Sequence, residues 1–220
     1  NSSLYSVVEL DGVEVSSYLT VTVSDVTTFE HLSLIINYGI PVTLGDYYTY
    51  GVSNLTINFV LGANLDFTSS SFKGLAISKA FPYMGSIDGN YKEITLAMNN
   101  ANSRLGAFIN YASSDAATII KNLTLKGNIT AKYYAAFVGE FVGANSEIEF
   151  RNIINYMELN ADKSTALLIS LDSIKATFVD CTNYAEFDSS VFFSGRGSNV
   201  YYSGVNKNYG LARKNGNKEI

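Results

Sequence analysis

Acidic side chains are the residues of this 220-residue chain best suited to chemistry, because glycan-cleaving enzymes work with clustered carboxylates. Glu158 and Glu186 occupy the same place in two similar segments, and Glu147 and Glu149 alternate beside Arg151. In a strand, Glu147 and Glu149 would point to one face. We interpret them as part of a solvated outer face whose charge Arg151 balances. A calcium-dependent lyase would also need an Asp-rich cluster with calcium-ligand spacing, and the sequence contains none.

The other reactive side chains are expected to be structural. His31 is the only histidine and falls in a predicted helix, so a histidine-based triad on the strands is not expected. Cys181 takes the place of Leu123 and Ile153 in the repeat described below, which predicts a small core residue. As the only cysteine, it cannot form an internal disulfide. The Asp-Gly-Asn motif at 88–90 contains one acidic residue, Asp88, which is too few ligands for a metal ion, so we interpret it as a turn. Taken together, these residues lead us to expect no catalytic residue, metal or cofactor.

Tyrosines recur in successive parts of the chain and favour binding over catalysis. Rings that face solvent in a column would form a platform for sugar rings or for a partner protein. The candidate binding residues are Tyr133, Tyr134, Tyr156, Tyr184, Glu158 and Glu186, with the pair Tyr201-Tyr202 recurring later. The alternative is that these tyrosines pack corners and insertion loops.

The composition is typical of a folded β-protein with few surface charges. Hydrophobic residues make up 47% and charged residues 16%, and 16 tyrosines with two prolines favour strands. The net charge of −5 argues against a nucleic-acid partner. Insertion into a membrane is not expected, because no apolar run reaches the roughly 18 residues that span a bilayer. The opening NSSLYSVVEL resembles a mature chain or an excised piece. Glycosylation sequons occur at about the chance frequency, at Asn1, Asn54, Asn122 and Asn128.

The segments that carry these residues repeat, beginning at positions 120, 150, 178 and 201. Each begins with a large residue, has a small polar residue two positions later, and three of the four have asparagine five positions later. These positions hold Ile120, Phe150, Phe178 and Tyr201; then Asn122, Asn152, Asp180 and Ser203; then Leu125, Asn155, Asn183 and Asn206. A second series precedes them, at Ala107-Phe108, Ala136-Phe137, Ala166-Leu167 and Val191-Phe192. Strand-rich units of this length predict the coils of a parallel β-helix.

One coil of such a helix cannot bury its own apolar face, so equivalent residues of successive coils must stack. Asn155, Asn183 and Asn206 are therefore expected to form a structural ladder of side-chain amide hydrogen bonds along the axis. Asparagine also tolerates the left-handed backbone of a tight corner. We expect these coils to occupy residues 61–220.

Residues 1–60 have a different pattern, which predicts strands and a short amphipathic helix that covers one open end of the coils. Thr27 and Glu30 form a capping box, and Gly39 is placed for a C-terminal cap. The apolar face of this helix would contain Phe29, Leu32 and Ile36. The last coil has no such cover, which predicts that the natural chain continues and would permit self-association through the coil ends.

Four short motifs carry a resemblance to a known family. They are LGANLDF at 61–67, Asp-Gly-Asn at 88–90 followed by Ile94, AAFVG at 135–139, and FVDCTN at 178–183. They resemble motifs of bacterial cell-surface proteins with GLUG-type repeats, although Tyr91 stands where that family usually has glycine. The resemblance implies a pectin-lyase-like, right-handed parallel β-helix in a secreted or wall-anchored protein, often an adhesin.

The sequence therefore predicts an all-β, right-handed parallel β-helix with an N-terminal cap containing a short α-helix. The predicted role is a non-enzymatic extracellular module, the binding region or stalk of an adhesin that recognises a glycan or a protein of a host or neighbouring cell. A polysaccharide lyase or hydrolase of the β-helix type and a structural subunit of an extracellular filament remain open as alternatives.

Overall fold

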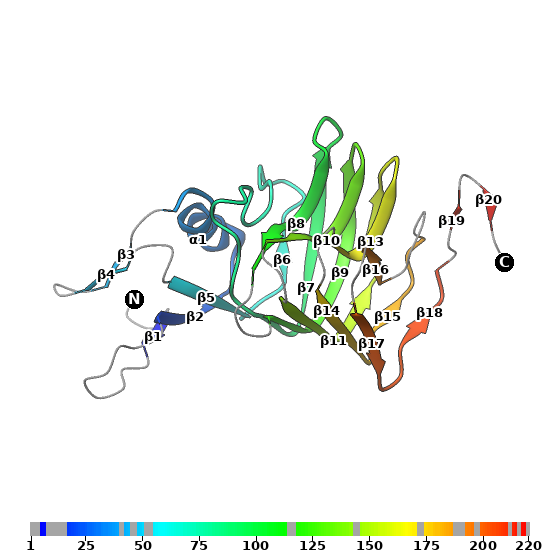
Figure 1. Cartoon of the computed structure of the whole chain (residues 1–220). Coiled ribbons are helices and arrows are strands. Elements are labelled where there is room, and N and C mark those ends of the chain that lie inside the picture. The colour runs from blue at the N-terminus through cyan, green and yellow to red at the C-terminus, as the bar shows by residue number, and fades with distance from the viewer. Residues whose placement is uncertain are drawn as a thin grey trace.

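The chain forms a parallel β-helix of about four turns, with one α-helix near its N-terminus (Figure 1). The structure is a computed structural model that describes residues 5–7, 17–39, 42–44, 48–50, 55–113, 118–142, 146–170, 174–186, 192–195, 199–210, 213–214 and 217–218. Within these residues the repeat of the sequence becomes a stack of coils, each built from strands of two sheets. The all-β prediction and the parallel β-helix are thus confirmed.

The first sheet runs along the helix axis as one path of neighbouring strands. After the antiparallel strand β1 (Tyr5–Val7), the parallel order is β2 (Ser17–Val23), β5 (Leu55–Leu61), β7 (Ile87–Asn100), β9 (Thr118–Ala131), β11 (Glu147–Asn155), β14 (Lys175–Val179) and β17 (Asn199–Ser203). Short strands continue it: β6 (Leu65–Asp66) on β7, β12 (Glu158–Asn160) on β9, β15 (Thr182–Asn183) on β11, and β18 (Lys207–Asn208) on β15. β2 and β5 belong to this sheet. The N-terminal part of the chain, up to residue 61, therefore contributes strands to the sheet in addition to forming the α-helix.

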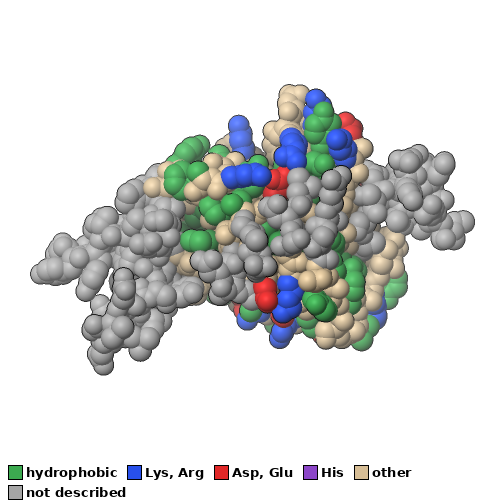
Figure 2. Space-filling view, in the orientation of Figure 1, with side chains coloured by type: hydrophobic (Ala, Val, Ile, Leu, Met, Phe, Trp, Pro, Cys, Tyr) green, Lys and Arg blue, Asp and Glu red, His purple; other side chains and the backbone are tan. Residues whose placement is uncertain are grey.

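The second sheet closes the other side of the later coils. Its parallel order is β16 (Phe193–Gly195), β13 (Ser164–Ser170), β10 (Tyr134–Phe141) and β8 (Leu105–Ala112). Ala107, Ala136 and Ala166 lie in register, as their recurrence predicts. Lysine and arginine side chains gather over the tips of the coils (Figure 2). Two small antiparallel pairs are separate from both sheets: β3 (Val42–Leu44) with β4 (Tyr48–Tyr50), and β19 (Arg213–Lys214) with β20 (Asn217–Lys218).

Equivalent core residues stack from coil to coil, as expected from the need to bury each coil's apolar face. Ile120 lies beside Phe150, and Phe150 beside Phe178, with the two phenyl centroids 5.2 Å apart. The last described coil departs from the predicted alignment by one residue. Phe178 is in register with Tyr202, not with Tyr201, and the two rings stack at 5.7 Å.

The left-handed corner of each coil explains this one-residue shift. Asn122, Asn152 and Asp180 have φ of 53°, 52° and 53°, and the next corner residue with positive φ is Gly204 at 67°. The alignment that places Ser203 at the corner is therefore wrong. Glycine adopts this conformation without strain, so it takes the corner in place of asparagine or aspartate. The polar side chains of the corner also join the coils, because Asn152 Nδ2 donates to Asn122 Oδ1 at 3.0 Å.

The α-helix α1 (Val26–Tyr38) lies at the N-terminal end of the stack (Figure 1). Its N-cap is Asp25, whose carboxylate accepts the backbone N–H of Thr28 at 2.7 Å, so the predicted capping box at Thr27 is wrong. Aspartate two residues upstream is an equally good cap, and it starts the helix two residues earlier. Gly39 is the predicted C-cap, in the left-handed region. Phe29 and Ile36 are buried, which fastens α1 to the coils.

Candidate functional site

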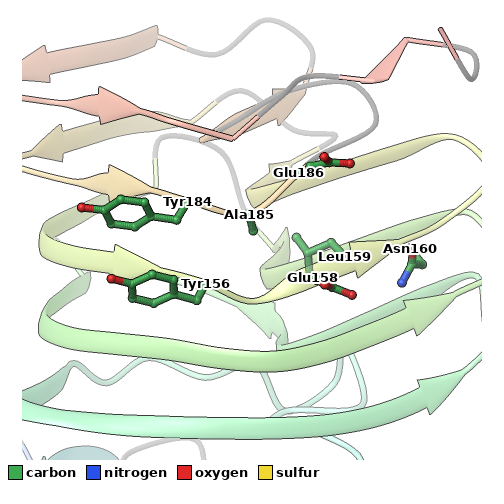
Figure 3. Close-up of a pocket in the computed structure, with 7 residues that line it drawn as sticks. All are labelled: Tyr156, Glu158, Leu159, Asn160, Tyr184, Ala185 and Glu186. Carbon is green, nitrogen blue, oxygen red and sulfur yellow. The ribbon is translucent and has the colours of Figure 1, made fainter. Parts of the chain in front are cut away.

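A shallow groove on the outer face of the first sheet collects the tyrosines and acids that the repeat singled out. One coil contributes Tyr156, Glu158 and Asn160, and the next contributes Tyr184 and Glu186 (Figure 3). Alternation along β12 places these side chains outward, while Leu159 between them is buried. The groove therefore combines two aromatic rings, two carboxylates and one amide on successive coils.

The aromatic residues of the groove form a stacked column. The ring centroids of Tyr156 and Tyr184 are 4.7 Å apart and their planes differ by 5°. Tyr209 continues the column, 5.1 Å from Tyr184 with a 13° difference. Parallel rings at these distances are offset, so each ring covers only part of its neighbour's face. Tyr156, Tyr184 and Tyr209 remain 46%, 46% and 60% exposed. Tyr184 has a ring stacked on each of its faces, so its edge and hydroxyl group are the parts that a ligand can reach.

An asparagine ladder directly beneath the tyrosines holds this column. Asn155 Nδ2 donates to Asn183 Oδ1 at 2.7 Å, and Asn183 Nδ2 donates to Asn208 Oδ1 at 2.9 Å. Asn155 and Asn183 are completely buried. Each tyrosine follows its ladder asparagine in the chain, so the ladder fixes the spacing of the rings.

Asn208, not Asn206, is the third member of the ladder, so that part of the prediction is wrong. Asn206 lies at the corner instead, where its side chain accepts the Cys181 N–H at 2.9 Å and donates to the Phe178 carbonyl at 3.1 Å. The dipeptide Asn-Tyr at 155, 183 and 208 was the sequence signal that identifies both the correct ladder and Tyr209. An alignment on the first residue of each coil misses it, because the last coil has one extra residue between Tyr202 and Asn208 compared with the stretch from Phe178 to Asn183.

In the coils nearer the N-terminus, the column position is not occupied by tyrosine. The register places Lys126 and Thr95 at the position of the tyrosines in the preceding coils. Lys126 Nζ binds Glu93 Oε2 at 2.7 Å there. A second, more open hollow lies between this ion pair and the free side of Tyr156. Aromatic rings occupy the column only from Tyr156 onward.

Tyr133 and Tyr134 lie away from this column, at the turn that joins β9 to β10. Both are half-buried and have cations over their rings. The ammonium groups of Lys132 and Lys163 lie 5.1 and 4.7 Å from the Tyr133 ring centroid, and the Arg104 guanidinium lies 5.5 Å from that of Tyr134. The structure thus separates the candidate binding residues into two groups on different parts of the helix.

The remaining acids of the first sheet form ion pairs on an exposed face, as predicted. Glu149 pairs with Arg151 at 2.6 Å, and Glu147 pairs with Lys175 of the next coil at 3.1 Å. Across the described part of the chain, no group of three or more His, Cys, Asp or Glu side chains is placed to hold a metal ion.

One charged cluster was missed by the sequence analysis. Glu140 is 3% exposed, and its carboxylate lies 2.7 Å from Lys79 Nζ and 3.1 Å from an Arg104 nitrogen. The signal was an acid within the otherwise apolar strand AAFVGEF. A buried carboxylate in such a strand needs a cation, because transfer out of water disfavours its charged form.

Cys181 is a buried core residue, as its place in the repeat predicts. Burial raises the pKa of its thiol from 9.0 to about 11, so the thiolate needed for nucleophilic attack is scarce at neutral pH. His31 lies exposed on α1, as predicted.

The raised pKa of Cys181 makes the stability of the fold depend on pH. Above pH 9 the unfolded chain loses the thiol proton that the folded chain keeps until about pH 11. We expect the free energy of unfolding to fall by about 2 kcal/mol between pH 8.5 and 10.5 from this group alone. Urea unfolding of the wild type and of Cys181→Ala at both pH values measures it. Equal pH dependence in the two proteins would show that the thiol is not the cause.

No helix among the described residues is long and apolar enough to cross a membrane. No protein-family model matches the chain, and neither a curated protein nor a solved structure is significantly similar to it.

Proposed function

We propose that this chain is a non-enzymatic, extracellular binding module of the adhesin type, and that its groove binds a glycan chain. The observation that carries the proposal is the column Tyr156–Tyr184–Tyr209, in which offset rings remain about half exposed on the outer face. A contiguous set of exposed aromatic side chains of this kind is typical of a binding surface.

The column supports a linear sugar ligand for a geometric reason. Its rings repeat once per coil, at the strand spacing of about 4.8 Å, along the helix axis. The apolar C–H face of a sugar ring packs on an aromatic ring, and hydroxyl groups bind carboxylates and amides. Glu158, Glu186 and Asn160 line the same groove and supply those groups; Figure 3 shows them beyond Leu159 and Ala185 from the two rings. A chain laid along the axis would contact rings and polar groups at each coil.

The charge of the groove limits the classes of glycan that can bind in it. Both charged side chains that line it are acids, Glu158 and Glu186. A polymer rich in uronic acid or sulfate would be repelled, because like charges in contact are unfavourable. We therefore expect a neutral or amine-bearing glycan. The GLUG-like motifs, such as FVDCTN at 178–183, support a place on the outside of a cell.

Hydrolysis of the glycan is the second candidate, because two carboxylates line one groove. Glycoside hydrolases place their two acids on either side of the scissile bond. Glu158 and Glu186 instead follow one another along the column, on one side of a chain laid along the axis. A lyase would need a base to abstract a proton, and the described residues lining the groove include no lysine, arginine or histidine. Binding without cleavage fits this arrangement better.

Loss of one ring is expected to weaken binding. Titration calorimetry with neutral and amine-bearing oligosaccharides should show Tyr184→Ala binding about tenfold more weakly, because its stacked contacts with both neighbours and with the sugar are lost. Tyr38→Ala is the matched control, since Tyr38 is 61% exposed on α1 and far from the groove in the chain. Chromatography of the same mixtures measures cleavage.

Three outcomes of this titration are informative. Tyr184→Ala binding as tightly as the wild type would exclude the column as the site. An equal loss in Tyr38→Ala would show that the effect is not specific to the groove. Shortened oligosaccharides after incubation would show that the protein is a hydrolase and not a binding module, and Glu158 and Glu186 would be the residues to substitute next.

A further inference from the structure

The turns at one edge of the helix stack in register over several coils. Lys132 N donates to Ser103 O at 2.9 Å, and Lys163 N donates to Tyr133 O at 3.1 Å. Tyr134 N donates to Arg104 O at 3.0 Å. These bonds join the turns that precede β8, β10 and β13, so their side chains are held at a regular spacing along the axis.

This edge presents a row of cations. Successive coils each contribute one or more, namely Lys79, Arg104, Lys132 and Lys163. In the space-filling view, lysine and arginine side chains gather over these tips (Figure 2). The side chains of Lys79 and Arg104 are 55% and 52% exposed, and Lys132 and Lys163 are exposed residues. The row is therefore accessible although the chain as a whole carries a net charge of −5.

The fold positions the cationic groups before any ligand arrives. Buried Glu140 draws Lys79 and Arg104 together, at 2.7 and 3.1 Å. The Lys132 and Lys163 ammonium groups both lie over the Tyr133 ring, at 5.1 and 4.7 Å. Held in this way, the side chains lose less conformational entropy when they bind an anion.

Two acids lie near the four cations of the row. Glu140 pairs with Lys79 and Arg104, and exposed Asp162 is next to Lys163 in the chain. A tyrosine ring attracts cations but carries no net charge, so it does not neutralise Lys132 and Lys163. Among the ion pairs of the described residues, none involves either lysine. An anion bound near this ring would be attracted by both ammonium groups.

We infer that this edge, which we call the cationic row (Lys79, Arg104, Lys132 and Lys163), binds a linear anionic polysaccharide through its carboxylate or sulfate groups. The coils are about 4.8 Å apart, a length comparable to one sugar unit, so one charge per sugar matches one cation per coil. A duplex nucleic acid packs its charges much more densely, and its backbone would be repelled by the acidic remainder of the protein. A membrane surface would favour a broad patch, whereas Arg104, Lys132 and Lys163 follow one another at the stacked turns of successive coils.

The cationic row is independent of the tyrosine column. Arg104, Lys132 and Lys163 lie at the turns before β8, β10 and β13, and Lys79 lies beside Glu140 of β10, whereas the column starts at Tyr156 on the outer face of the first sheet. The two sites also have opposite charge, so they select different polymers. A protein with both would contact a neutral and an acidic glycan at once, which increases avidity for a mixed surface.

Binding to immobilised polymers tests the inference. Polygalacturonate offers carboxylates, dextran sulfate offers sulfates, and dextran is the neutral comparison. The variant K132Q/K163Q keeps a polar side chain at each position but removes both charges. K92Q/K207Q is the matched control, since it makes the same change in net charge at residues of β7 and β18. We expect K132Q/K163Q to bind at least one anionic polymer about tenfold more weakly, and the control to bind like the wild type.

The dependence on salt and the tyrosine variants separate the remaining explanations. Wild-type binding should weaken as salt rises, and Tyr156→Ala/Tyr184→Ala should keep it, whatever happens to the neutral glycan. Equal losses in both lysine variants, equal binding of dextran, or no loss in K132Q/K163Q would each overturn the inference. Tighter binding to vesicles containing phosphatidylserine than to either anionic polymer would also overturn it, in favour of a membrane surface. Urea unfolding of each variant excludes misfolding as the cause.

Discussion

Replacing Phe29 with alanine is expected to lower the free energy of unfolding by about 3–5 kcal/mol. Phe29 is fully buried, and its ring centroid lies 4.7 Å from that of Phe59 and 5.5 Å from those of Phe67 and Phe108. It is the side chain by which α1 enters the core of the coils. Removing the ring leaves a cavity among aromatic side chains that cannot easily collapse. For a domain with a total stability of about 5–15 kcal/mol, this is a large fraction.

Urea unfolding followed by circular dichroism measures the effect as a shift of the midpoint at constant slope. Phe29→Leu is the matched control, because it keeps an apolar side chain in the site and should lose about 1.5 kcal/mol or less. Leu34→Ala, on the exposed side of the same helix, should change little. A midpoint for Phe29→Ala equal to that of the wild type would mean that α1 contributes no stability to the coils, contrary to its place in the structure.

Replacing Asn183 with alanine is the second large effect that we expect, about 2–4 kcal/mol of stability. The Asn183 amide donates to Ala185 O at 2.8 Å and Asn208 Oδ1 at 2.9 Å, and it accepts from Asn155 Nδ2 at 2.7 Å. Without it, the buried Asn155 Nδ2 donor keeps only a 3.4 Å contact with the Met157 carbonyl, while Asn155 Oδ1 still accepts the Met157 N–H at 3.2 Å. An amide that is buried without partners loses its hydration and gains nothing in return.

The position of Asn208 provides the control for this prediction. It is exposed at the end of the same ladder, so water can replace its bonds, and Asn208→Ala should cost less than about 1 kcal/mol. Thermal unfolding of the two variants compares them directly. If Asn208→Ala destabilised the protein as much as Asn183→Ala, burial of the ladder would not be the source of its stability. The Asn183 variant should also disturb the Tyr156–Tyr184 stack, because Tyr184 follows the lost residue in the chain.

The central coils could be predicted from the sequence because their repeat is set by packing. Phe150 and Phe178 stack because each coil must bury its apolar face on the next. Asn155 and Asn183 form a hydrogen bond because buried amides need partners. The last coil could not be aligned as well. Two adjacent tyrosines, Tyr201 and Tyr202, both fit its first position, and only the left-handed corner at Gly204 decides between them.

The candidate site was only partly predictable for a related reason. The repeat places Tyr156 and Tyr184 together, because equivalent residues of neighbouring coils stack. Tyr133 and Tyr134 resemble them in type, but they belong to a turn whose length varies from coil to coil. Long-range ion pairs leave no periodic trace, so the two cations that pair with Glu140 could be located only in three dimensions.

The helix cap illustrates the limit of local signals. Thr27 with Glu30 and Asp25 with Thr28 are both acceptable N-terminal patterns within four residues of each other. The choice depends on where the chain leaves β2, which ends at Val23, and that is set by pairing with β5. Tertiary structure therefore decided between two local solutions of similar energy.

The most direct test of the proposed function is a glycan array probed side by side with the wild type and with Tyr156→Ala/Tyr184→Ala. The tyrosine column predicts that the wild type binds a set of neutral or amine-bearing glycans and that the double variant loses that set while remaining folded. Identical binding patterns for the two proteins, or wild-type binding confined to acidic glycans, would contradict it.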